Sequence, residues 1–291
     1  MSFVDFSHLM DREAFPFHVM EALAREPVDY LKQFEFVDRQ RKNQGDWGAG
    51  GVLVPLFFCG DPTQARNPSG HYVFLLSKRS KSVQQPGDLC APGGGIHSRL
   101  DSLLGKLLKL GLFPLVRSPG LALARRRGKR TFGKLLLLLG NALRESWEEL
   151  RLSPINVEFL GPLPAYRLYH RPWTIFPLVG RVKHCWNPRF NWEVEKIVSI
   201  PLENFFYPEN YAIYSLEVPE ALIHQGIPNP WEFPCLVHQE EGKEEILWGA
   251  TFEIIRAFFQ IVFAFSFPVP DRQRIIRRPL ALNYLSGREK P

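Results

Sequence analysis

Three glutamates lie close together in residues 141–152, at Glu145, Glu148 and Glu149. A helix places side chains three and four positions apart on one face, so this segment predicts three neighbouring carboxylates. Anions at this spacing repel each other unless a cation lies among them, and carboxylate oxygens are ligands that suit Mg²⁺ and Mn²⁺. The alternative interpretation is a solvated acidic helix face, which the triplet alone does not exclude.

A glycine-rich turn precedes this helix in the sequence, at Gly93, Gly94 and Gly95. Glycine lets the backbone approach a ligand closely, which favours a binding loop here. Lys78 and Arg79 end an apolar, strand-like segment just before the turn. Basic side chains at a strand end can hold phosphate oxygens, although a solvated edge is the alternative. We expect substrate contacts from Lys78, Arg79, Gly93 and Gly95.

Together these segments resemble the Nudix hydrolase family, whose signature is G-x5-E-x7-R-E-U-x-E-E-x-G-U, where U is a bulky apolar residue. Gly95 and Asp101 match the opening of the signature, and residues 144–152 match its close. The chain departs from the signature at four points: Asp101 for the first Glu, Ser146 at U, Arg151 at Gly, and residues 102–143 where the family has seven residues. Because this long insertion separates Asp101 from the acidic helix, we do not place Asp101 in the site.

The resemblance implies an α/β fold, the Nudix α/β/α sandwich with a mixed sheet, here with a helical insertion. It implies Mg²⁺- or Mn²⁺-dependent cleavage of a phosphoanhydride in a nucleoside diphosphate derivative. Glu148 and Glu149 would bind the metal directly, together with a backbone carbonyl at Gly94. Glu145 would be a further ligand or the group that orients the attacking water. The expected catalytic residues are Glu145, Glu149 and Arg144, the last by pairing with a carboxylate that fixes the helix.

Three further segments carry the resemblance. Residues 75–80 and 85–94 are similar to the coenzyme A pyrophosphatase branch of the family, although Gln84 and Gln85 replace its histidine and Ala91 replaces its phenylalanine. Coenzyme A or a related dinucleotide is therefore one candidate substrate. Glu193 lies in a segment similar to one near the family's active site, and is either an extra ligand or base, or a surface charge. The alternative function is a Nudix-like protein that has lost hydrolysis and binds a nucleotide or a membrane.

The insertion, residues 102–140, contains nine basic residues and no acidic one, so the remainder of the chain carries +6 − 9 = −3. Leucines at 103, 104, 107 and 108 have amphipathic helical spacing. Three interpretations stay open: a helical hairpin that packs on its own domain or on a second subunit of a homodimer, contact with an anionic membrane surface, or contact with another anionic partner. Aromatic residues are too few for a single-strand stacking platform, so we expect no specific nucleic acid.

The rest of the chain predicts one domain with additions. We expect an N-terminal helical extension at 1–49, the catalytic domain at 50–265 and a basic, partly disordered tail at 266–291. Residues 52–59 and 71–79 predict a hairpin-like pair of strands, and 173–182 a third strand. Pro55 and Pro177 predict edge or bulge positions in these strands, since proline cannot donate to the ladder.

Composition favours a cytoplasmic protein. The four cysteines are widely spaced without a CxxC pair, which indicates a reducing compartment rather than a zinc site or a disulfide framework. The N-terminus lacks the basic region of a secretory signal, and no apolar run approaches the roughly 20 residues of a membrane span. A peripheral membrane location would follow if the insertion binds lipid.

Overall fold

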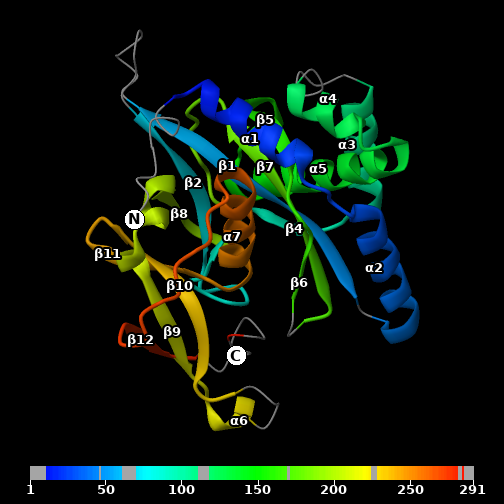
Figure 1. Ribbon diagram of the computed structural model, residues 1–291. Helices are drawn as coiled ribbons and strands as arrows, with labels where there is room; N and C mark the ends of the chain where they lie inside the picture. Colours follow the sequence, from blue (N-terminus) through cyan, green and yellow to red (C-terminus); the bar gives the residue numbers. More distant parts are fainter. Residues whose placement is uncertain are drawn as a thin grey trace.

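The computed structural model describes residues 11–45, 47–60, 70–110, 118–168, 171–223, 228–280 and 284. Within them the chain forms an eight-stranded sheet and a four-stranded sheet (Figure 1). The helices are α1 (Ala14–Arg25), α2 (Tyr30–Gln44), α3 (Ser98–Lys109), α4 (Pro119–Arg125), α5 (Lys129–Leu150), α6 (Glu220–Ile223) and α7 (Gly249–Phe263), with 3₁₀ turns at Pro154–Asn156, Leu202–Phe206 and Pro208–Asn210.

The larger sheet is mixed. Its strands are β1 (Gly48–Gly60), β2 (Gly70–Arg79), β3 (Leu89–Cys90), β4 (Gly93–Gly95), β5 (Val157–Pro162), β6 (Tyr166–Arg167), β7 (Trp173–Val182) and β8 (Val194–Pro201). The central order is β3-β2-β1-β7-β5, in which β1 runs parallel to β7 and antiparallel to β2. The smaller sheet has the order β11-β10-β9-β12, with β9 (Tyr211–Glu217), β10 (Trp231–Glu240), β11 (Lys243–Trp248) and β12 (Ile275–Pro279).

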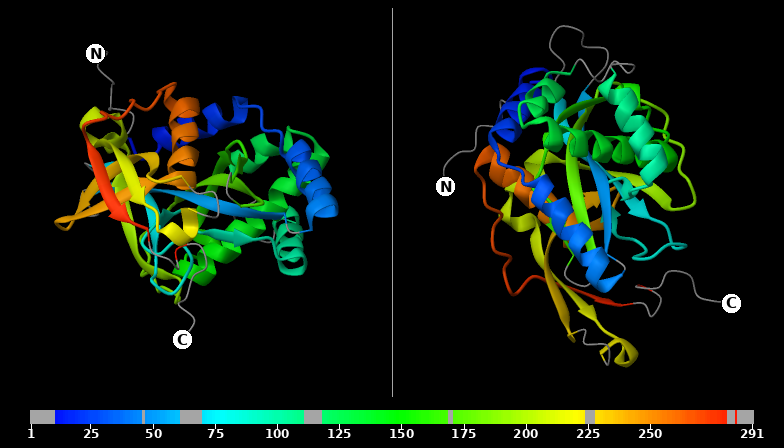
Figure 2. Two further views of the ribbon diagram at one scale, coloured as in Figure 1. Left: turned by 90° about the horizontal axis from the view of Figure 1, so that it is seen from below. Right: turned by 90° about the vertical axis from the view of Figure 1, so that its right-hand side faces the viewer.

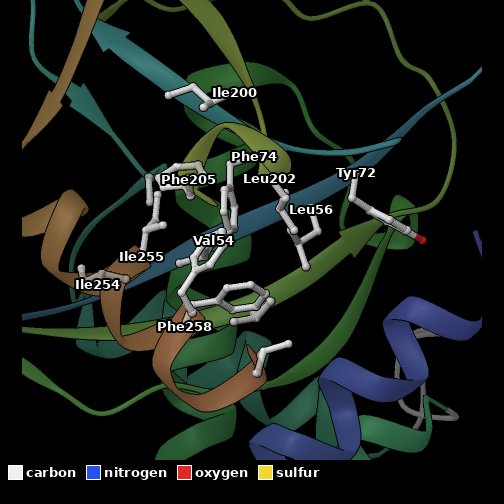
Figure 3. Close-up of a cluster of buried hydrophobic side chains, with 14 of the residues drawn as sticks. Val54, Leu56, Tyr72, Phe74, Ile200, Leu202, Phe205, Ile254, Ile255 and Phe258 are labelled. Atoms are coloured by element: carbon white, nitrogen blue, oxygen red, sulfur yellow. The ribbon is translucent and has the colours of Figure 1, made fainter. Parts of the chain in front are cut away.

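Side chains that alternate along β1 divide the interior between the two faces of the larger sheet. Val54 and Leu56 belong to a cluster with the apolar side chains of α1 and α7. Figure 3 shows Val54 and Leu56 beside Phe258 of α7. Leu53 belongs to the cluster on the other face, which is formed with α2 and α5. Helices therefore cover both faces of a mixed sheet (Figure 1), and the predicted α/β class with helical additions is confirmed.

The predicted strand pair is confirmed, because β1 and β2 are antiparallel with Leu56 opposite Phe74. The edge positions predicted from the prolines are wrong, since both β1 and β7 lie inside the sheet. Pro55 falls between the part of β1 that pairs with β4, ending at Val52, and the part that pairs with β2, beginning at Leu56. Pro177 likewise falls between the partners of β7 in β6 and β5. A missing N–H costs little at such a gap in the ladder.

The described parts of the N-terminal extension and of the C-terminal tail both contact the rest of the fold. Residues 14–25 and 30–44 of the extension are helical, and the Tyr30 hydroxyl lies 2.8 Å from the carbonyl oxygen of Leu163. The described part of the predicted basic tail, residues 266–280 and 284, contains β12, which pairs in parallel with β9. Leu280 and Tyr284 are buried. Composition does not predict this strand, because it contains the charged residues Arg277 and Arg278. Charged residues are tolerated there because β12 is an edge strand of the smaller sheet.

The described part of the insertion is helical, but its limits differ from 102–140. Helix α3 begins earlier, at Ser98, and α5 runs unbroken from Lys129 into the acidic segment. Gly140 lets α3 approach α5 closely: a Cβ there would lie 3.0 Å from the carbonyl oxygen of Asp101. All four cysteines are free thiols. Among the described residues, no helix combines the length and the apolar character needed to cross a bilayer.

Candidate active site at the junction of α5 and the glycine turn

Helix α5 is fixed to the larger sheet by a close approach to β1. A Cβ on Gly51 would lie 2.6 Å from the carbonyl oxygen of Leu138, so only glycine fits there. Asn141 is fully buried; its Oδ1 accepts from the Gly51 N–H at 2.7 Å and its Nδ2 donates to the Gly95 carbonyl at 2.9 Å. Asn141 therefore joins the helix, the central strand and the glycine turn. The sequence signal for this role was a polar residue, Asn141, between Gly140 and Ala142 in an otherwise apolar segment.

The helix ends in a conformation that explains one departure from the signature. Arg151 adopts the left-handed region with φ of 56°, and its N–H donates to the carbonyl of Trp147 at 3.0 Å. Glycine is the residue that enters this region most easily, so Arg151 keeps the geometry at a cost of about 1 kcal/mol. Ser146, the other departure in the helix, is buried and donates its hydroxyl to the Ala142 carbonyl at 2.7 Å. Neither substitution breaks the helix.

The three glutamates do not share one environment. Glu145 and Glu149 face the glycine turn: the side chain of Glu145 is 14% exposed and Glu149 is 7% exposed. A Cβ on Gly94 would lie 2.6 Å from the Glu145 carboxyl, and the Gly93 N–H donates to Glu149 Oε1 at 3.4 Å. Glu148 is 48% exposed and pairs with Arg144 at 3.0 Å. The predicted common face is thus divided into an inner pair and an outer residue.

The inner pair is electrostatically strained. Burial, reinforced by the charges of Glu145 and Glu193, raises the pKa of Glu149 to about 8. The Gly93 N–H and the Arg79 charge act in the opposite direction. Burial also raises the pKa of Glu145, against the lowering effect of Arg144. A cation between the two carboxylates would relieve this penalty, because it favours their ionised forms.

Arg144 organises the carboxylates around it. Its guanidinium contacts Asp101 at 2.8 Å, Glu145 at 2.8 Å and Glu148 at 3.0 Å. Asp101 is fully buried and also accepts from the His97 N–H at 2.6 Å. The expectation that the insertion keeps Asp101 away from the helix is wrong, because α3 folds back along α5 and brings the two residues together.

Lys78 and Arg79 have different surroundings, since neighbouring residues of a strand point to opposite faces. Arg79 donates from Nε to the Gln84 carbonyl at 2.7 Å, and its charge reaches Glu149. Lys78 instead pairs at 3.0 Å with Glu245, whose side chain is 3% exposed. Of the two, Arg79 is the base that lies near the acidic pair.

The loop between β2 and β3 is held by groups that the motifs did not indicate. Asp88 accepts from Trp248 Nε1 at 3.1 Å and from the Tyr284 hydroxyl at 2.5 Å. Burial raises the pKa of Asp88 to about 6, although these hydrogen bonds lower it. The Gln85 N–H also donates to the Tyr284 carbonyl. Residues far apart in sequence supply these contacts, so no local pattern predicts them.

Glu193 lies close enough to raise the pKa of Glu149, and the adjacent Asn191 N–H donates to the Glu149 carbonyl at 3.1 Å. A metal site of three or more His, Cys, Asp or Glu side chains is not assembled among the described residues. The structure therefore brings together Glu145, Glu149 and the turn at Gly93–Gly95. Glu148 pairs with Arg144 on the exposed side of these residues, and Lys78 pairs with Glu245.

No protein-family model matches the sequence, and no curated protein matches it either. The solved structures that the chain resembles include several Nudix proteins. A Caenorhabditis elegans Ap4A hydrolase binary complex matches at 13% identity and a TM-score of 0.33, over 54% of this chain and 81% of its own. A MutT/nudix family protein from Enterococcus faecalis matches at 12% identity and a TM-score of 0.39, over 87% and 75%.

The NUDIX domain of Shewanella oneidensis NrtR, in complex with ADP ribose, matches at 12% identity and a TM-score of 0.31, over 57% of this chain and 79% of its own. Likenesses of this size do not place the chain in the family.

Proposed function

We propose that this protein is a Nudix-type hydrolase that cleaves a phosphoanhydride bond in a nucleoside diphosphate derivative with the help of Mg²⁺ or Mn²⁺. The observation that most supports this proposal is the inner pair: the carboxylates of Glu145 and Glu149 are largely buried and lie against Gly93 and Gly94. Glu145 pairs with Arg144, but Glu149 has no ion pair among the described residues. Burying two neighbouring carboxylates with one arginine costs folding stability, and such a cost is typical of functional sites.

The donor set fits a hard divalent cation. Carboxylate oxygens from Glu145 and Glu149 and the backbone carbonyl of Gly94 are the proposed ligands, with Glu148 as the further ligand that the signature implies. A Cβ on Gly50 would lie 2.1 Å from the Gly94 oxygen, so glycine at 50 keeps that carbonyl unobstructed. Bound there, the cation would shield the charge of the anhydride and lower the pKa of a bound water.

The remaining residues position the site and bind the substrate. Asn141 fixes the distance between α5 and the turn, and Asp101 fixes Arg144, which in turn orients Glu145. We assign phosphate binding to Arg79 and to backbone N–H groups of Gly93 and Gly95, because the Arg79 charge and the Gly93 N–H both act on Glu149 and Gly95 belongs to the same turn. Lys78 is a weaker candidate, since Glu245 already neutralises it. A reducing, cytoplasmic compartment remains our proposal on the cysteine spacing.

The test is a phosphate-release screen with Mg²⁺ or Mn²⁺ over coenzyme A, NADH, ADP-ribose and dinucleoside polyphosphates. We expect turnover of at least one of these substrates, and a loss of about 10²-fold or more in Glu149→Gln, a change that removes one ligand charge. Glu21→Gln, on the exposed side of α1, is the matched control and should retain full activity. Turnover that survives in Glu149→Gln with unchanged metal dependence would refute the assignment.

A further inference from the structure

Helix α3 has two contrasting faces. Asp101, Gly105 and Leu108 are buried, as expected for the side that packs on α5. On the other side Leu100 is 48% exposed, Leu103 is 54% exposed, and Leu110 at the end of the helix is 72% exposed. The right-hand view in Figure 2 shows α3 on the outside of the molecule beside α5. The fold buries half of this amphipathic helix and leaves the other half in water.

Exposed apolar side chains continue from α3 onto its neighbour. A pocket of about 140 Å³ lies between α3 and α5 and is lined by Leu104, Leu108 and Trp147, among others. Trp147 is 43% exposed, and Ile155, just after α5, is 51% exposed. The leucines of α3 and the indole of Trp147 therefore border one apolar surface. Contiguous exposed apolar surface of this kind marks an interaction site.

Basic side chains surround this surface. Arg99, Lys106 and Lys109 are exposed on α3, and none has an ion-pair partner within the described ranges. At 100° per residue, Lys106 and Arg99 lie directly beside Leu103 on the helix surface. More exposed bases occur near the start of α5, at Arg125, Arg126, Lys129 and Arg130.

Two other bases of the insertion have roles inside the fold. The Arg127 guanidinium donates to the carbonyls of Leu23, Ala24 and Glu26 at the end of α1, and Lys134 Nζ lies 4.4 Å from the centre of the Phe34 ring. The bases on α3 have no such role among the described contacts. Their position beside exposed leucines is therefore not explained by folding.

We propose that the outer face of α3, formed by Leu100, Leu103, Leu107 and Leu110 together with Trp147, docks on an anionic lipid bilayer. Leucines beside lysines on one exposed helix face match the acyl boundary and the charged headgroups of such a surface. Tryptophan suits the same interface, because its ring is apolar and its N–H is polar.

A second copy of this chain fits the surface less well. A two-fold dimer brings the same patch of both copies together, so the interface would collect Arg99, Lys106 and Lys109 from each copy and gather like charges. Nucleic acid would account for the bases but not for the leucines. An anionic bilayer accounts for both, and this inference is independent of the catalytic assignment.

The experiment is co-sedimentation of the full-length protein with vesicles of phosphatidylcholine, and with equimolar phosphatidylcholine and phosphatidylglycerol. We expect binding to the anionic vesicles only, weakened by salt. Leu100→Ser with Leu103→Ser should weaken partition about tenfold through lost apolar burial. Lys106→Gln with Lys109→Gln should weaken it by about fivefold for each lysine. The Trp147 emission should shift to the blue on binding, measured as the difference from Trp147→Phe.

The matched controls lie away from α3: Val269→Ser, at a side chain that is 92% exposed, and Lys243→Gln, at the exposed first residue of β11. Both should bind vesicles like the unaltered protein, and far-ultraviolet circular dichroism should show that every variant is folded. Three results would overturn the proposal: equal sedimentation with both vesicle types or with neither, a lipid-independent dimer that Leu100→Ser with Leu103→Ser dissociates, or binding to short duplex RNA that the leucine variant retains in full.

Discussion

Arg144 Nε donates to Asp101 Oδ1 over 2.8 Å, and this contact joins the first turn of α3 to the helix that carries the glutamates. Asp101 is fully buried and the Arg144 side chain is 13% exposed, so the pair lies largely out of water. The same arginine contacts Glu145 and Glu148. Loss of Asp101 would therefore affect both the stability of the fold and the position of the site.

We predict that Asp101→Ala lowers the free energy of unfolding by about 3 kcal/mol, because it leaves a largely buried guanidinium with one partner fewer. Urea denaturation measures this change. Asp101→Asn should cost less, since its amide oxygen can still accept from the His97 N–H. Combined with Arg144→Gln in a double-mutant cycle, the two changes should be coupled. Additive losses would show that the contact contributes nothing of its own.

The local elements of this fold could be predicted from sequence, and the long-range contacts could not. Apolar runs identified β1, β2 and β7, and the spacing of Glu145, Glu148 and Glu149 identified the acidic helix. The sequence does not show that Glu148 turns outward to Arg144, because that depends on which helix face α3 and the glycine turn occupy. Pairing between Asp101 and Arg144 depends on how the insertion folds back onto α5. The local spacing of apolar and polar residues does not predict that contact.

The C-terminal contacts escaped prediction for a similar reason. Strand β12 is basic in sequence and gains its partner only when β9 is in place. Tyr284 is buried against Asp88, a contact between residues 196 positions apart. From sequence alone such loops resemble polar linkers, because the residues that hold them in place are distant in the chain.

Gly94 gives a test of the close contact between the turn and the acidic pair. We predict that Gly94→Ala displaces the Glu145 carboxyl, which lies 2.6 Å from the position of the new Cβ. Since a flexible side-chain end can move, the fold should survive while hydrolysis falls at least tenfold. Activity and thermal unfolding, measured side by side, separate the two effects.

Gly133→Ala is the control for this change, because Gly133 is exposed on α5 with no atom within 4 Å of a new Cβ. Alanine there should stabilise the helix by about 0.4–1 kcal/mol and leave activity unaltered. If Gly94→Ala were as active as Gly133→Ala, the turn would not take part in the site.

The two adjacent bases should respond differently to the same substitution. Arg79→Gln removes a positive charge near Glu149, and we predict a rise of about tenfold in KM with a smaller change in kcat. Lys78→Gln removes a partner of the buried Glu245 and should lower stability with little effect on KM. Steady-state kinetics with urea denaturation tests both. A rise in KM for Lys78→Gln alone would reverse the assignment.

Asp88 predicts a pH dependence of stability. Burial raises its pKa in the folded state from 3.8 to about 6, so the folded protein binds this proton more tightly than the unfolded chain does. The stabilisation that results is complete below about pH 4, declines as pH rises, and is lost above about pH 6. The amplitude is on the order of 3 kcal/mol. Asp88→Asn cannot ionise, and its unfolding free energy should lack this component.

The measurement is urea denaturation from pH 4 to pH 8 of the unaltered protein, Asp88→Asn and Glu232→Gln, the last at an exposed position of β10. The difference in unfolding free energy between the unaltered protein and Asp88→Asn should change through this pH range. The contributions of the other titrating groups cancel in that difference. Glu232→Gln should give a constant difference. A constant difference for Asp88→Asn as well would mean that Trp248 and Tyr284 hold Asp88 with an ordinary pKa, and that its burial carries no electrostatic cost.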